Sequence, residues 1–182
     1  MNMASSLLYR FAGRLRYRLI SIAGRPYLER HFLFKRFGMT AYLPHFVSGD
    51  DERNVHDHPW LWAFSVILAG GYTEERLRWF DPDCGFALDL RRMFPLRINI
   101  IGPRAFHRII KPKPGTWTLF VHGPRVKRWG FLEHCARYAA GQDRSMVYHE
   151  TVYRQPYTAG ESRDWIYTAP RAAEARKDGA RG

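Results

Sequence analysis

From Gly38 onward, the sequence is a series of short apolar or aromatic runs separated by glycine, proline and aspartate. Runs of this length and composition, bounded by turn residues, are typical of β-strands. Because no long helical pattern alternates with them, the series predicts an all-β, mainly antiparallel sandwich or barrel. The expected strands lie at 39–47, 61–68, 72–79, 95–101, 105–110, 116–122 and 127–132.

The segments outside this series have other patterns. Apolar residues over 4–23 recur at helical spacing beside a second stripe of arginines, which predicts a basic amphipathic helix. A short helix is expected over 133–143, and the aromatic stretch 145–168 is expected to extend the sheet or wrap across it. The chain therefore divides into a basic N-terminal helical segment over 1–36, a barrel domain over 37–168 and a disordered tail over 169–182, which has almost nothing to bury.

The net charge of +12 is concentrated towards the chain ends, where residues 1–36 carry eight basic residues and one acidic residue. A helix rich in arginine and leucine can pack on the outside of a domain, make peripheral contact with a membrane surface or serve as a transit peptide, and the sequence leaves these three interpretations open. No zinc-finger, helix-turn-helix or RNP phrase occurs, so nucleic acid is not indicated as a partner.

Two cysteines, Cys84 and Cys135, are too few for a disulfide scaffold and favour a reducing, cytoplasmic location. No run of eighteen apolar residues occurs, which excludes a membrane-spanning helix. The motifs of serine hydrolases, P-loop nucleotide-binding proteins and zinc peptidases are also absent. The chemistry must therefore come from another group of residues.

The most informative stretch is His56-Asp57-His58. Side chains at i and i+2 of an extended segment point to the same face, so two imidazoles can approach one point while Asp57 faces away. His107, inside an expected strand, is the candidate third ligand, and imidazoles suit a divalent transition metal such as Fe, Zn, Ni or Cu. The alternative is a pair of hydrogen-bonded loop histidines without a metal.

Several phrases between Tyr27 and Phe131 form a recognisable pattern: Tyr27-Leu28-Glu29-Arg30, Gly49, His56-Asp57-His58-Pro59-Trp60, Gly70-Gly71-Tyr72-x-Glu74, His107-Arg108-Ile109 and Trp129-Gly130-Phe131. With these phrases the stretch resembles the cupin superfamily, and in particular small, mostly uncharacterised bacterial and phage cupin-like proteins. The resemblance implies a cupin-like double-stranded β-helix, or jelly-roll barrel, with a metal site near the H-x-H pair. A homodimer is also compatible with it.

One position departs from the usual cupin motif, because Trp62 and Ala63 stand where a ligating glutamate is common. Two ligand sets follow: three histidines alone, or three histidines with Glu74. Strand alternation places Tyr72 and Glu74 on one face, so both are candidate catalytic residues. For all-histidine sites the resemblance implies Fe(II), with Zn, Ni or Mn as alternatives.

The proposed site has further candidate residues for a small or tethered anionic substrate. Trp62 and Trp117 can stack on a planar or apolar group, and Arg104 and Arg125 can bind a carboxylate or phosphate. Three functions remain open: a mononuclear non-haem iron oxygenase-type enzyme, a cupin module that binds a ligand without turnover, or a metal-independent sugar-type isomerase or epimerase.

Overall fold

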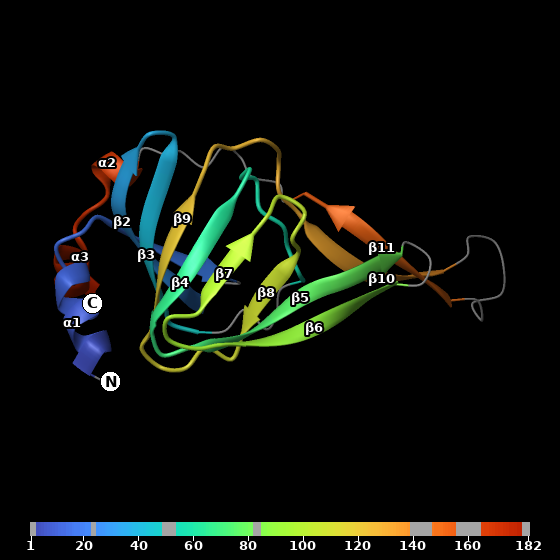
Figure 1. Cartoon of the computed structure of the whole chain (residues 1–182), viewed down its shortest axis with the longest axis horizontal. Coiled ribbons are helices and arrows are strands. Elements are labelled where there is room, and N and C mark those ends of the chain that lie inside the picture. The colour runs from blue at the N-terminus through green and yellow to red at the C-terminus, as the bar shows by residue number, and fades with distance from the viewer. Residues whose placement is uncertain are drawn as a thin grey trace.

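In the described part of the chain, antiparallel strands form a six-stranded sheet and a second sheet built from a three-stranded and a two-stranded ladder, with short helices near the chain ends (Figure 1). The computed structural model describes residues 3–22, 25–48, 54–81, 85–138, 147–155 and 165–179. Every strand pairing within these ranges is antiparallel, so the predicted all-β, mainly antiparallel fold is confirmed. Gly49 and Cys84 lie outside the described residues.

The larger sheet has six strands in the order β1-β2-β3-β9-β4-β7. Its inner face carries Leu28, Phe46 and Ile67, which pack with Tyr72 and Met93 of the second sheet into an apolar core cluster. Burial of such side chains on both inner faces is what holds two sheets together. The strands are β1 (Tyr17–Ile22), β2 (Arg25–Arg36), β3 (Met39–Phe46), β4 (Ala63–Ala69), β7 (Ile98–Ile101) and β9 (Thr116–His122).

Within the described residues, the second sheet consists of two ladders that are connected through the segment around His56. The strand order is β6-β5-β8 in one ladder and β10-β11 in the other. His56 forms isolated bridges both to His107 at the start of β8 and to Phe131 at the start of β10, and thereby connects the two ladders. The strands are β5 (Tyr72–Asp81), β6 (Gly85–Met93), β8 (His107–Ile110), β10 (Phe131–Tyr138) and β11 (Val147–Arg154).

The helices α1 (Met3–Ala12) and α3 (Ala172–Gly179) lie beside each other at one end of the molecule, and the short α2 (Trp165–Thr168) precedes α3 (Figure 1). Helix α1 covers part of the outer face of the six-stranded sheet, where Trp117 donates its indole N–H to the Ser5 hydroxyl at 3.0 Å. None of the helices in the described ranges is long and apolar enough to cross a membrane.

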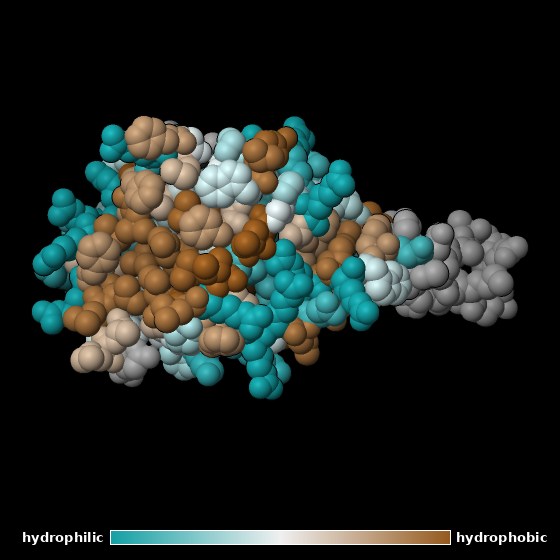
Figure 2. All heavy atoms as spheres, in the orientation of Figure 1, coloured by the Kyte–Doolittle hydropathy of each residue, from teal (hydrophilic) through white to brown (hydrophobic). Residues whose placement is uncertain are grey.

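Helix α1 leaves another part of this outer face uncovered. Apolar side chains gather over β4 and β7 (Figure 2), where Ile98 and Ile100 are in register with Val66 and Phe64. Ile98 is 60% exposed and Ile100 is 71% exposed. The predicted homodimer is compatible with such a surface, but it stays a prediction.

Two segments that were expected to be helical differ from this expectation. The N-terminal helix ends at Ala12 rather than near residue 23, because the chain from Tyr17 onward pairs with β2 as a hairpin. The expected helix over 133–143 is strand β10 as far as Tyr138, where pairing with β11 overrides local helical preference, and residues 139–143 lie outside the described ranges.

The tail predicted as disordered also contains structure. Ala172 is fully buried, and its backbone N–H donates to the Leu15 carbonyl at 3.0 Å. The next residue, Ala173, donates to the Gly13 carbonyl at 3.0 Å. Small side chains at these two positions allow the start of α3 to approach the end of α1, which composition alone did not indicate. Residues 180–182 lie outside the described ranges.

A buried histidine on the outer face of the six-stranded sheet makes stability depend on pH. His31 is fully buried beside Trp117, and its Nδ1–H donates to the Leu43 carbonyl at 2.9 Å. Burial lowers the pKa of His31 from 6.5 to about 4. The unfolded chain therefore binds the proton first as the pH falls, and the free energy of unfolding should drop between pH 6.5 and about 4.

We expect His31→Phe to flatten this part of the stability profile. The variant loses the hydrogen bond to Leu43 but no longer carries a group that is protonated only when unfolded, and the difference amounts to up to about 3 kcal/mol across the window. Urea unfolding of both proteins at several pH values measures it. Parallel profiles for the two proteins would contradict this role of His31.

Candidate metal centre

Three histidines from distant parts of the chain converge at the junction of the second sheet. His56 and His107 exchange two backbone hydrogen bonds, of 3.0 and 2.9 Å, which fixes their relative position. The Nε2 atoms of His58 and His107 lie 2.7 Å apart, and one ring nitrogen from each of the three residues lies within 4.8 Å of the others. The predicted convergence of His56, His58 and His107 is therefore present in the structure.

A buried carboxylate fixes the orientation of the His107 ring. Glu74 on β5 is fully buried, and its Oε1 accepts hydrogen bonds from His107 Nδ1 at 2.5 Å and from Asn99 Nδ2 at 2.7 Å. Burial opposes ionisation of Glu74, but these hydrogen bonds, together with the nearby Arg76 charge, outweigh it and lower the carboxyl pKa below its usual value. Because Nδ1 of His107 donates to a carboxylate, the Nε2 lone pair is left facing His58.

This donor set fits a divalent transition metal. Three imidazoles with converging nitrogens are a common ligand set, and a carboxylate that holds the far nitrogen of a ligating histidine is the usual supporting contact. Of the two ligand sets open from the sequence, the geometry favours three histidines alone. Glu74 points towards the cluster as predicted, but it contacts His107 Nδ1 rather than joining the converging nitrogens.

Aromatic rings surround the cluster and limit its contact with water. Trp60 stacks on His58 with ring centroids 4.9 Å apart, and Phe120 lies 6.3 Å from the same ring. Trp129 and Phe131 lie edge-on to His56 at 6.1 and 5.8 Å. Burial, followed by the neighbouring histidines, lowers the pKa of His58 well below its usual value, which favours the neutral form that binds metals.

Asp57 anchors the H-x-H segment from its opposite side. As predicted, it faces away from the two imidazoles. Its carboxylate accepts the Gly130 backbone N–H at 2.7 Å, and it is paired with Lys127 and the Tyr153 hydroxyl. Burial and the Asp57 charge raise the pKa of Tyr153 to about 12, so its hydroxyl stays a donor. Arg104 lines a cavity with Asp57, on this far side of the segment.

The structure does not bring the other predicted site residues to the histidines. Tyr72 lies in the apolar core cluster, where its hydroxyl bonds with Asn99 and Ser65, and burial raises its pKa. Trp62 lies parallel to Phe64, with ring centroids 6.2 Å apart.

The last two predicted residues lie elsewhere. Trp117 is fully buried on the outer face of the six-stranded sheet, stacked on His45 at 4.3 Å. Arg125 is exposed and donates through Nε to the Lys127 carbonyl at 3.1 Å.

Two residues near the site were missed from the sequence. Asn99 lies on the inner face of β7 and supports Glu74. Arg30 follows Leu28 by two residues on β2, so both side chains lie on the inner face of this strand. The positive charge of Arg30 contributes to the lowered pKa of His58. A lone asparagine in a four-residue strand and one arginine among many in a basic segment carry no signal that separates them from surface residues.

Comparison with known proteins yields fold neighbours only. No protein-family model and no curated protein matches the chain. The similar solved structures include hydroxypropylphosphonic acid epoxidase from S. wedmorenis, with 9% identity over 59% of this chain and 55% of that chain and a TM-score of 0.43. KdgF from Halomonas sp. has 13% identity over 60% of this chain and 88% of that chain, also with a TM-score of 0.43.

A putative mannose-6-phosphate isomerase from Ralstonia eutropha JMP134 has 18% identity over 57% of this chain and 90% of that chain, with a TM-score of 0.43. The antiparallel strands described above are consistent with the predicted jelly roll. The chain spans only 55% of the epoxidase, and at these identities the likeness concerns the fold alone.

The position of Trp117 leads to a stability prediction. Trp117→Ala leaves a large cavity under α1 and should lower the free energy of unfolding by about 3–5 kcal/mol. Chemical denaturation measures this loss, and the metal content of the fraction that folds should be unchanged. A stable variant with altered ligand binding would instead support the predicted role of Trp117 in substrate recognition.

Proposed function

We propose that this protein is a mononuclear metal-dependent enzyme of the oxygenase type, in which His56, His58 and His107 hold a divalent metal, with Fe(II) preferred. The observation that carries the proposal is the approach of three ring nitrogens to within 4.8 Å, with one ring held by a buried carboxylate. When bound, a ferrous ion with three imidazole ligands has open coordination positions for a substrate and dioxygen.

The residues around the cluster support ligand binding in distinct ways. Glu74 holds the Nδ1 proton of His107, and Asn99 in turn donates to Glu74, so the tautomer of the ligating ring is fixed. Trp60 and Phe120 pack beside the His58 ring, and His56 and His58 stay partly accessible to solvent. A donor set that is held in position in this way costs little reorganisation when a metal binds.

The proposed substrate is a small or tethered anionic molecule. Arg30 is the candidate anchor, because it lies on the inner face of β2 and its charge reaches His58. Its guanidinium also lies over the Tyr42 ring at 5.4 Å, which positions it within the barrel. Of the two arginines that the sequence suggested, Arg104 lines the cavity beside Asp57, and Arg125 donates to the Lys127 carbonyl.

A second candidate function has its own support. The 2.7 Å contact between His58 and His107 is also a good hydrogen bond if one Nε2 is protonated. In that case the pair is suited to acid–base chemistry without a metal, as in an isomerase or epimerase. Metal analysis separates the two functions.

Protein purified without added metal should contain about one equivalent of a divalent transition metal per chain, measured by elemental analysis. His107→Ala should lose most of this metal because it removes a ligand. His122→Ala is the matched control, because His122 stacks on Trp60 at 4.2 Å within the same aromatic surroundings but lies outside the cluster of converging nitrogens.

The ferrous protein should also bind nitric oxide, a dioxygen analogue, and give the electron paramagnetic resonance signal of a high-spin iron–nitrosyl adduct. If folded wild-type protein had no affinity for any divalent metal, the metal-dependent function would be overturned. That result would leave the acid–base alternative.

Glu74→Gln tests the support given to His107. The amide keeps the shape of the side chain but removes the charge that holds the Nδ1 proton, and metal affinity should fall roughly 10–100-fold. A competition titration against a chelator measures this change. Glu75→Gln is the matched control, because the neighbouring carboxylate lies on the opposite face of β5 and pairs with Arg108. Equal effects of the two substitutions would contradict the role of Glu74.

A further inference from the structure

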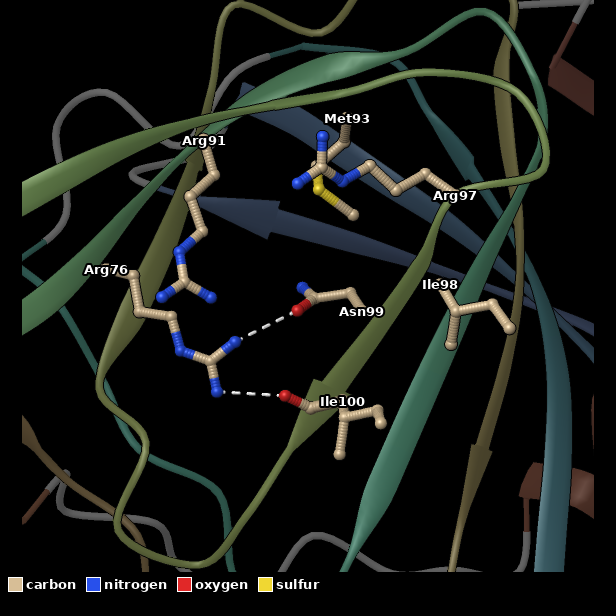
Figure 3. Close-up of a pocket in the computed structure, with 7 residues that line it drawn as sticks. All are labelled: Arg76, Arg91, Met93, Arg97, Ile98, Asn99 and Ile100. Carbon is tan, nitrogen blue, oxygen red and sulfur yellow. Dashed lines mark hydrogen bonds between the residues drawn. The ribbon is translucent and has the colours of Figure 1, made fainter.

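A second polar cavity lies between the two sheets, at the side where β6 and β7 form their edges. It has a volume of about 280 Å³ and is lined by Arg76, Arg91, Met93, Arg97, Ile98, Asn99 and Ile100. Figure 3 shows Arg76 and Arg91 together on one side of this cavity, while Arg97 extends across it from the opposite side. Three guanidinium groups therefore border one small space.

The strand register explains why these side chains face inward. Arg91 on β6 is the partner of Glu74 on β5, and Arg76 follows Glu74 by two residues, so all three share the inner face of this sheet. Arg97 comes from the other sheet, immediately before β7. The cavity is thus built from both sheets, and each sheet contributes positive charge.

Arg76 is held in place by hydrogen bonds, and Arg97 lies over the Phe94 ring at 5.4 Å. Arg76 donates to Asn99 Oδ1 at 3.1 Å and to the Ile100 carbonyl at 2.8 Å, which orients its guanidinium towards the cavity. Among the described residues, neither Arg91 nor Arg97 forms an ion pair with a carboxylate.

Two carboxylates lie nearby, but within the described part of the chain neither forms a direct ion pair with the three arginines. Glu74 already accepts hydrogen bonds from His107 and Asn99. Asp89 is in register with Arg76 on β6, yet it forms no ion pair within the described part of the chain. Arg76 is half-buried and Arg91 and Arg97 are exposed, so an anion from solvent can reach all three guanidinium groups. Like charges gathered around one small space repel one another, and a bound anion relieves that repulsion.

We propose that Arg76, Arg91 and Arg97 bind the phosphate group of a small molecule. A planar carboxylate offers its two oxygens in one plane, whereas a tetrahedral phosphate can accept hydrogen bonds from guanidinium groups on opposite sides of a cavity. This site goes beyond the proposed metal centre. It is separated from the histidines by Asn99 and Glu74, and the chain of contacts Arg76–Asn99–Glu74–His107 connects the two.

The test is calorimetric titration of the full chain, stripped of metal and dialysed free of chelator, at low ionic strength. Inorganic phosphate should bind saturably at one site per chain. Arg91→Ala should weaken this binding by about tenfold or more, since it removes a charge-assisted contact. Arg92→Ala is the matched control, because Arg92 carries the same charge on the opposite face of β6 and should change affinity by less than about twofold.

The titrations with other anions identify the source of the phosphate. Methyl phosphate binding at least as tightly as inorganic phosphate indicates a phosphate monoester, and binding of inorganic phosphate alone indicates free phosphate. Acetate binding as tightly as phosphate would overturn the assignment. Non-saturable binding, or equal weakening in the two arginine variants, would also overturn it. Because metal-free protein is used, these outcomes do not depend on the metal centre.

Discussion

The hydrogen bond between Glu74 and His107 joins the interior of the barrel to the histidine cluster. A fully buried carboxylate is costly unless it is paired, and Glu74 is stabilised by His107 and Asn99 from two different sheets. The same contact determines which nitrogen of His107 is available at the cluster. One interaction therefore both satisfies a buried charge and prepares a ligand, which explains why Glu74 lies behind the cluster rather than within it.

The backbone places the histidine cluster at the point where the two ladders of the second sheet, β6-β5-β8 and β10-β11, are connected. Among the described residues, His56 forms isolated bridges to both β8 and β10, and its backbone hydrogen bonds to His107 fix two of the three imidazoles by main-chain geometry. Asp57, on the other face, fastens the same segment to Gly130. Side chains positioned by sheet hydrogen bonds hold their geometry better than side chains on free loops, as a metal centre requires.

Much of the barrel could be predicted because strand signals are local. The runs at 39–47 and 116–122 match β3 and β9 within one residue, and the i, i+2 spacing of His56 and His58 correctly places both on one face. Tertiary pairing decided the rest: a stretch with helical spacing became β1 because β2 was available as a partner.

The site residues missed in the sequence analysis were missed for a common physical reason. Asn99 and Arg30 act through neighbours that are distant in sequence, so neither has a local pattern that indicates its role. For the aromatic residues the error was the reverse, because residues predicted to belong to the site lie outside it. Trp117 and Trp62 are of a residue type common in binding surfaces, but the face of the sheet on which each lies decides what it contacts. The sequence alone does not say which face is covered by α1.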